Sequence, residues 1–185
     1  MLRIFSIFLT LTLLLVPSVF AGEKAPQKLV DYVNAKLVNF GSDPVILEAV
    51  KAENAKGKTL AQIKDEDAKW MAFAGIDNFM QTLMENPCAK RLMTIKQETK
   101  FFSEIFVMDN QGANVCMTDK TSDYWQGDEE KFIESFKGGK GGINISEVKF
   151  DDSSQAYLVQ ASVPVMDGGK AIGAITFGID IDNFK

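Results

Sequence analysis

The sequence predicts an α+β protein in which N-terminal helices pack on a five-stranded, mainly antiparallel sheet. Three observations lead to this prediction. Apolar residues recur every three or four positions in the first half of the chain, as on helices with one buried face. In the second half they alternate with polar residues, as in strands. The composition, 46% hydrophobic and 24% charged over 185 residues, is that of an ordinary globular protein of about one domain.

Residues 1–21 are predicted to be a secretory signal peptide, which leaves residues 22–185 as a single domain. Arg3 precedes an apolar run over residues 4–16, and Ala21 supplies a small residue before the cut. The run has about 13 residues, fewer than the roughly 20 that span a bilayer, so cleavage is favoured over a retained anchor. We expect the mature protein in the periplasm.

The composition disfavours several classes of function. A formal net charge of −5 disfavours binding to nucleic-acid phosphates. Histidine is absent, which removes His-based catalytic triads and His-ligated metals. No nucleophile motif is present, and two cysteines are too few for a zinc ribbon. We therefore expect no catalytic residue, metal, cofactor or nucleic-acid partner.

The two cysteines, Cys88 and Cys116, leave two interpretations open. An exported chain reaches a compartment that permits disulfides, and a bridge here would close a loop of about 28 residues. The alternative is a pair of buried free thiols that act as small core residues.

Three helices are predicted in the first half. The first has apolar residues at helical spacing over residues 29–40. Asp43 is expected to cap the second, with Pro44 at its first position, and Gly57 to end it. Thr59 can cap the third, which Asn86-Pro87 ends. One apolar stripe is expected on this third helix: Trp70, Phe73, Ile76, Met80 and Leu83.

The second half is predicted to form the sheet and one inserted helix. Two short apolar runs, residues 104–108 and 113–118, flank a turn and predict a hairpin. A polar and aromatic loop follows over residues 119–127. A helix then begins with acidic residues and buries Phe132, Ile133 and Phe136. Three further strands are expected: residues 143–150 with a bulge near Ser146-Glu147, residues 157–165, and residues 171–181.

Four segments together resemble the Cache family of extracellular PAS-like sensor domains, in particular its free-standing periplasmic PDC sensor type. The segments are Ile105-Phe106-Val107-Met108-Asp109-Asn110-Gln111-Gly112, Thr121-Ser122-Asp123-Tyr124-Trp125-Gln126-Gly127-Asp128-Glu129, Val163-Pro164-Val165, and the run from Gly169 to Asp180. The resemblance covers about residues 28–182. It implies a long N-terminal helix packed on a five- to six-stranded antiparallel sheet. It also implies a ligand pocket between the sheet and the loop–helix segment after the second strand.

The loop of residues 119–127 holds most of the candidate ligand-binding residues. Tyr124 and Trp125 offer apolar rings with one polar group each, and Lys120 and Asp123 supply charge. We predict that the two rings wall the pocket. The alternative for Trp125 is that it only pins the loop onto the core, and the alternative for Asp123 is a turn cap.

The sheet supplies two further candidates, Gln160 and Asp180. Gln160 lies on the strand face opposite the apolar stripe. In amino-acid-binding Cache domains, an aspartate of the last strand holds the ligand's ammonium group, and Asp180 loosely resembles that aspartate in its position. The alternative is that Asp180 only lies at a solvated strand end. Those domains also use a loop arginine, whereas this loop has only Lys120, a poor substitute for a guanidinium fork. A small amine or small carboxylate is therefore favoured over an α-amino acid.

These observations predict an exported sensory domain that binds a small polar ligand and presents its ligand state to a membrane-bound receptor or kinase. The alternative is an adaptor that docks on an envelope receptor without a ligand of its own. A hydrolase using Asp119 and Asp123 is disfavoured, because both carboxylates lie in turn-like positions. Pairing of the long helix in a homodimer stays open, although no heptad seam is sustained.

Overall fold

A computed structural model of the chain describes residues 22–152 and 154–184. The predicted signal peptide, residues 1–21, lies outside the described residues. The helices are α1 (Gln27–Ala35), α2 (Pro44–Ala55), α3 (Leu60–Ala72), α4 (Asn78–Glu85), α5 (Pro87–Glu98) and α6 (Glu130–Phe136), with 3-10 turns η1 (Leu37–Ser42) and η2 (Lys137–Gly139). The strands are β1 (Phe102–Met108), β2 (Asn114–Met117), β3 (Asn144–Ile145), β4 (Lys149–Asp151), β5 (Ala156–Asp167) and β6 (Lys170–Asp180). Within this part of the chain, no helix is both long and apolar enough to cross a membrane.

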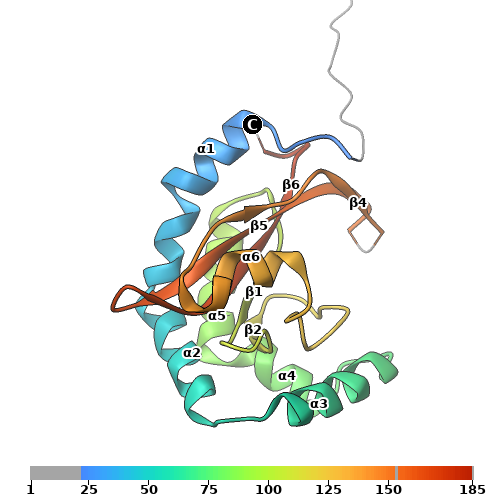
Figure 1. Cartoon of the computed structure of the whole chain (residues 1–185). Coiled ribbons are helices and arrows are strands. Elements are labelled where there is room, and N and C mark those ends of the chain that lie inside the picture. Colours follow the sequence, from blue (N-terminus) through green and yellow to red (C-terminus); the bar gives the residue numbers. More distant parts are fainter. Residues whose placement is uncertain (1–21, 153, 185) are drawn as a thin grey trace, which may run out of the picture.

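The six strands form one antiparallel sheet, which confirms the predicted α+β, PAS-like class (Figure 1). Their order is β2-β1-β6-β5-β3, and β4 also pairs with β5. The long hairpin of β5 and β6 forms its centre, and β6 lies between β5 and β1. The last strand of the chain is therefore the one that joins the two halves of the sheet.

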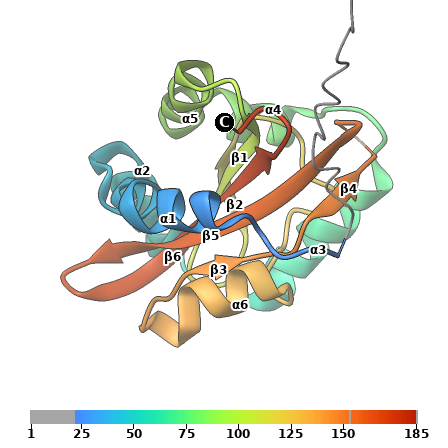
Figure 2. The same ribbon diagram turned by 90° about the horizontal axis from the view of Figure 1, so that it is seen from above.

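Helices cover the two faces of the sheet unequally. Helices α1, α2 and α5 lie along one face, and α6 lies on the other (Figure 2). Side chains such as Ile105, Val163 and Phe177 point to the first face and are fully buried. Phe106 and Met108 belong to a smaller cluster with residues of α3, α4 and α6. We call the first the helix-covered face and the second the cleft face.

The predicted starts of the second and third helices are confirmed by their caps, whereas the first predicted helix, residues 29–40, is wrong beyond residue 35, where Lys36 leads into η1. The Asp43 carboxylate accepts hydrogen bonds from the backbone N–H groups of Val45 and Ile46, at 3.0 and 3.4 Å. Thr59 and Gln62 form a reciprocal capping box at the start of α3. These bonds satisfy N–H groups that a helix cannot pair internally, so each cap fixes where its helix begins.

The predicted third helix is wrong in its middle, whereas its predicted end at Asn86-Pro87 is confirmed, because α4 ends at Glu85. It is two helices, because Asp77 caps α4 with a 2.8 Å bond to the N–H of Met80. Phe73 and Ile76 lie in the intervening turn with 46% and 55% of their surface exposed, so they are not part of a buried stripe. Asn86-Pro87 ends α4 but also starts α5, since the Asn86 side chain accepts from the N–H of Ala89.

Two details of the second half also differ from the prediction. Ile133 is 48% exposed rather than buried, because α6 turns Phe132 to the core and Ile133 outward. Residues 143–150 form two short strands, β3 and β4, instead of one strand with a bulge. The interruption falls at the predicted place, where the backbone N–H of Gln160 donates to the Ser146 hydroxyl rather than to a strand partner.

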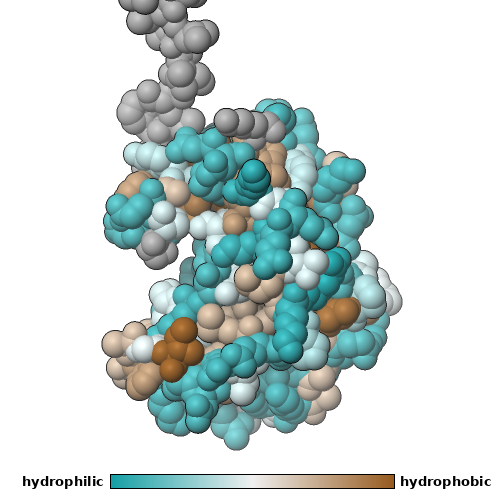
Figure 3. Space-filling model, turned by 180° about the vertical axis from the view of Figure 1, so that it is seen from behind, coloured by the Kyte–Doolittle hydropathy of each residue, from teal (hydrophilic) through white to brown (hydrophobic). Residues whose placement is uncertain are grey.

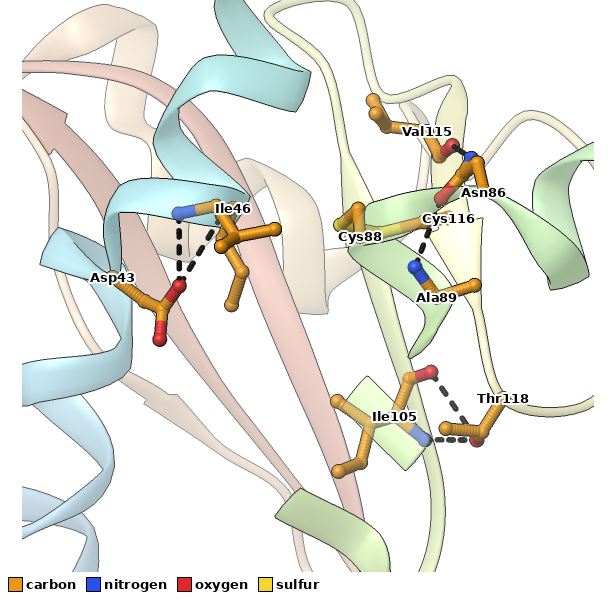
Figure 4. The surroundings of a disulfide bond; sticks show 10 residues. Asp43, Ile46, Asn86, Cys88, Ala89, Ile105, Val115, Cys116 and Thr118 are labelled. Atoms are coloured by element: carbon orange, nitrogen blue, oxygen red, sulfur yellow. Dashed lines mark hydrogen bonds between the residues drawn. A yellow bond between two sulfur atoms is a disulfide. The ribbon is translucent and has the colours of Figure 1, made fainter. Parts of the chain in front are cut away.

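A disulfide joins Cys88, in the first turn of α5, to Cys116 in β2 (Figure 4). Both residues are fully buried on the helix-covered face. Beside them the Asn86 amide donates to the carbonyl of Val115 at 3.0 Å. The start of α5 is thus attached to β2 by one covalent bond and one hydrogen bond.

Candidate functional site

A cleft of about 440 Å³ opens on the cleft face, between the sheet and the loop–helix segment that follows β2. This is the location that the family resemblance implied. The notch at the left of Figure 3 lies between the end of the molecule with β4 and the end with α3 (compare Figure 1). The residues lining the cleft are Trp70, Met71, Glu104, Phe106, Lys120, Thr121, Ser122, Gln126, Lys131, Asp151 and Gln160.

Three neighbouring strands form one polar row on the sheet side of the cleft. Gly178 of the central strand pairs with Glu104 of β1 on one side and with Gln160 of β5 on the other. A Cβ atom at position 178 would lie 2.6 Å from Cγ of Glu104, so only glycine leaves room for this side chain. The Gln160 amide donates to Oε1 of Glu104 at 3.2 Å across the gap.

The Glu104 carboxyl group has an unusual electrostatic environment. Burial raises its pKa above the ordinary glutamate value, and the nearby negative charges of Asp151 and Asp119 act in the same direction. The hydrogen bond from Gln160 and the charge of Lys131 oppose the shift only in part. The ionised form of Glu104 is therefore under-compensated in the folded protein.

The two lysines of the cleft already have partners. Nζ of Lys120 donates to the carbonyls of Phe73 and Gly75, at 2.6 and 2.9 Å, and so caps the end of α3. Nζ of Lys131 lies 3.0 Å from a carboxylate oxygen of Glu129. These contacts fix the positive charge of both lysines, and Nζ of Lys131 also lies 5.2 Å from the ring centroid of Phe106.

Buried hydrogen bonds hold the loop that closes the cleft. The Trp70 indole N–H donates to the carbonyl of Thr121 at 2.8 Å. The Asp67 carboxylate of α3 accepts from the backbone N–H groups of Tyr124 and Trp125, at 2.8 and 3.0 Å. Helix α3 therefore positions both ends of the segment from Thr121 to Trp125.

Of the six predicted ligand-binding residues, Lys120 and Gln160 line the cleft and the other four do not. Tyr124 is 1% exposed and lies behind the wall, where its ring is tilted by 34° against that of Trp70 and its hydroxyl accepts a hydrogen bond from Lys58. The Trp125 indole donates to the carbonyl of Gln111, and Lys64 covers its ring at 4.5 Å. This geometry corresponds to the alternative in which Trp125 pins the loop.

Asp123 and Asp180 have structural roles at turns. The carbonyl of Asp123 accepts from the Thr121 hydroxyl at 2.7 Å, which closes the loop, and burial raises the pKa of its carboxyl group. The Asp180 carboxylate accepts from the backbone of Asp182 and the amide of Asn183, which ends β6. Neither side chain is directed to the cleft by these contacts.

Glu104 and Trp70 are the main residues that sequence reasoning missed. Glu104 is the charged residue of a mainly apolar strand, and it has the same parity as Phe106. This charge was the available signal. Trp70 was assigned to the core because of its helical spacing. It does lie in the core at 2% exposure, but its ring also borders the cleft.

A second, larger hollow of about 660 Å³ lies between α2, α4 and the start of α5, next to the disulfide. Most of its walls are apolar or short side chains, such as Val45, Ala49 and Val115, and its charged residues include Glu53 and Lys56, which pair with each other. Ligand sites combine apolar walls with a few convergent polar groups, and the polar row around Gly178 gives the smaller cleft that combination. We therefore take the 440 Å³ cleft as the candidate site.

No protein-family model and no curated protein matches the sequence. Several solved structures have a similar fold. The sensor domain of the histidine kinase DctB of V. cholerae has a TM-score of 0.48 at 11% identity, over 85% of this chain and 52% of that chain. The sensory domain of the Campylobacter jejuni chemoreceptor Tlp3, with isoleucine bound, has a TM-score of 0.40 at 13% identity, over 83% of this chain and 62% of that one. The chain thus spans between about half and three fifths of these sensor domains.

Proposed function

We propose that the chain is an exported sensor domain that binds a small polar ligand in the cleft between the sheet and residues 119–131. One observation carries the proposal. Lys120 and Gln160, far apart in the sequence, meet in one hollow with the aromatic ring of Trp70 and the carboxyl group of Glu104. A few fixed polar groups beside an apolar wall are what a small polar ligand requires.

Transmission of the ligand state would start at the loop. A ligand that contacts Lys120 would disturb its hydrogen bond to the carbonyl of Phe73 at the end of α3. A ligand that contacts Thr121 would disturb the hydrogen bond from the Trp70 indole to the Thr121 carbonyl. We propose that a membrane-bound receptor or kinase in the envelope reads this change. Periplasmic location rests on the signal peptide that the sequence predicts.

The proposal contains no catalytic step. Asp119, one of the two carboxylates considered for a hydrolase, is exposed and bonds to Nζ of Lys96 at 2.6 Å. Asp123 does not line the cleft, and its backbone carbonyl accepts hydrogen bonds from the Thr121 hydroxyl and the Gln126 amide within its own loop. The two residues do not face a shared space in the cleft lining, so the geometry favours binding over acid–base chemistry.

The test is a thermal-shift and calorimetric screen of small amines, carboxylates, amino acids and neutral polyols against the purified mature chain. Ser122→Tyr, which fills the mouth of the cleft, is expected to abolish the binding of any hit. Thr94→Tyr, an exposed position on α5, is the matched control and is expected to bind like the wild type. Hits that bind equally to Ser122→Tyr would contradict the site. A protein that binds no probe but retains an envelope partner would support the adaptor alternative.

A further inference from the structure

We infer that the cleft takes a ligand with a protonated amine and that the Glu104 carboxylate is the group that receives it. The inference rests on the proposed function and deepens it, since the sequence left amine and carboxylate ligands equally open. It assigns the ligand class from the arrangement of charge in the cleft.

Three charged groups that line the cleft, those of Lys120, Lys131 and Glu104, differ in their partners. Each ammonium group has oxygen partners of the protein: two carbonyls for Lys120 and the Glu129 carboxylate for Lys131. The Glu104 carboxyl group instead has a neutral amide, that of Gln160, as its hydrogen-bond donor. Among residues 22–152 and 154–184, no cation lies within ion-pair distance of it. The missing partner in the cleft is therefore a cation.

The structure holds Glu104 in place although no cation of the described chain pairs with it. A largely buried carboxylate without a cation is destabilising unless another group compensates it. Even so, Gly178 clears the space for its side chain, and Gln160 fixes one of its oxygens. A hollow of about 170 Å³ beside the cleft shares Glu104, Asp151 and Gln160, so the carboxyl group borders accessible space on two sides. This arrangement preorganises an acceptor for a ligand.

A second acceptor points to the same class of ligand. Gln126 lines the cleft, is 1% exposed, and uses its amide N–H to donate to the carbonyl of Asp123. Its Oε1 atom is buried with no hydrogen-bond partner in the described part of the chain. Buried acceptors normally have a donor, so the site is short of donors rather than acceptors. An ammonium group brings three donors and no acceptor. Trp70 and Phe106 form part of the cleft wall, where each is at most 2% exposed and has a lysine Nζ over its ring.

Binding of the amine would also move a proton. Where Glu104 is protonated in the free protein, its ion pair with the ligand ammonium requires the carboxylate, so one proton leaves the carboxyl group for solvent. The charged groups that act on Glu104 are Lys131 of α6, Asp151 of β4 and Asp119 of the loop. Affinity for an amine is therefore expected to fall as the pH is lowered through the raised pKa of Glu104.

The experiment compares primary amines, carboxylates and alcohols of matched chain length, about three to six carbons, which suit a cleft of this size. We expect the amines alone to bind the wild type. Glu104→Gln keeps the shape but removes the charge, and it is expected to lose about 10- to 100-fold in affinity for amines. Glu98→Gln, an exposed glutamate at the end of α5, should bind as the wild type does. Calorimetry in buffers of different ionisation enthalpy, repeated as the pH is lowered through the raised pKa of Glu104, should detect a proton release that grows as the pH falls for the wild type and none for Glu104→Gln.

Three outcomes would overturn the inference, and they separate it from the proposed function. Binding of carboxylates alone, blocked by Ser122→Tyr, would refute the ligand class while the site survives. Amine binding that Glu104→Gln leaves unchanged would refute the role of this residue. Absence of binding by every probe would refute both. A purely structural role of Glu104 predicts a change in unfolding stability without a change in affinity or in proton release.

Discussion

Along β1 the side chains alternate between two environments. Ile105 and Val107 point to the helix-covered face and are fully buried among apolar neighbours. Glu104 points the other way, to a cleft that also receives Gln160 of β5. The same strands thus build a closed apolar core on one side and an open polar site on the other. Because the side-chain period of a strand is two residues, each face can carry its own chemistry without altering the backbone.

The sharpest test of this comparison is a large-to-small substitution on each face. Phe177→Ala removes a fully buried ring that packs against Phe40 and Phe102 on the helix-covered face. We expect a loss of about 3–5 kcal/mol in the free energy of unfolding, measured with urea. Gln160→Ala on the cleft face should cost about 1 kcal/mol or less. Equal costs at the two positions would mean that the faces do not differ in packing.

The disulfide tests whether the helix-covered face depends on a covalent link. Replacing both cysteines, Cys88→Ala with Cys116→Ala, opens a loop with a sequence separation of 28 residues. The unfolded chain then gains freedom, and we expect a loss of about 3 kcal/mol of stability. Reducing agent should destabilise the wild type by a similar amount and leave the double variant unchanged. A wild type that is insensitive to reduction would argue against a stabilising bridge.

A substitution of Trp125 tests whether this residue belongs to the ligand-binding cleft or only to the structure that supports it. Trp125→Ala removes the hydrogen bond to the Gln111 carbonyl and the contact with Lys64, and should cost about 1–3 kcal/mol. Affinity per folded molecule should not change, because this ring does not line the cleft. Trp125→Phe, which keeps the ring surface, should recover part of the stability. Loss of binding in a well-folded Trp125→Ala would move the boundary of the site.

The smallest expected effect is on the pH dependence of stability, to which Glu104 and Glu53 contribute with opposite sign. The folded protein raises the pKa of Glu104 through burial, so its contribution to stability falls as the pH rises from the unfolded value through the raised one. At Glu53 burial is outweighed by hydrogen bonds from Lys56 and Lys58, and the pKa is lowered. Its contribution is therefore lost as the pH falls through the folded value.

Urea unfolding of Glu104→Gln and Glu53→Gln at a series of pH values measures this difference. Relative to the wild type, the free energy of unfolding of Glu104→Gln should increase as the pH rises, and that of Glu53→Gln should decrease. Parallel curves for the two variants would show that the environments are not distinct.

Local chemistry explains what the sequence could predict. Two short apolar runs around a turn identified the hairpin of β1 and β2, and alternation identified β5. The caps at Asp43 and Thr59 were identified from side chains that bond to nearby backbone. The break between α3 and α4 was missed because Phe73 and Ile76 keep helical spacing. Helix α5 was missed because Asn86-Pro87 serves at once as a stop and as a start.

The candidate site was only partly predictable, because its residues come from distant segments. Lys120 and Gln160 were identified from the polarity of their own neighbourhoods. Tyr124 was misplaced because burial by α3, through the bonds of Asp67 to the loop backbone, is a tertiary contact. The role of Gly178 depends on strand register, since Glu104 and Gln160 become its neighbours only when β6 lies between β1 and β5. No local pattern contains that information.

The central position of β6 also determines the order in which this protein can fold. Strand β1 pairs with β6 along much of its length, and so does β5, yet β6 ends at Asp180. Until the chain has been synthesised as far as residue 180, neither β1 nor β5 has its inner neighbour, and a stable sheet cannot form. Such long-range pairing makes assembly slow. For a chain proposed to be exported, the sheet therefore remains unformed for as long as β6 is missing.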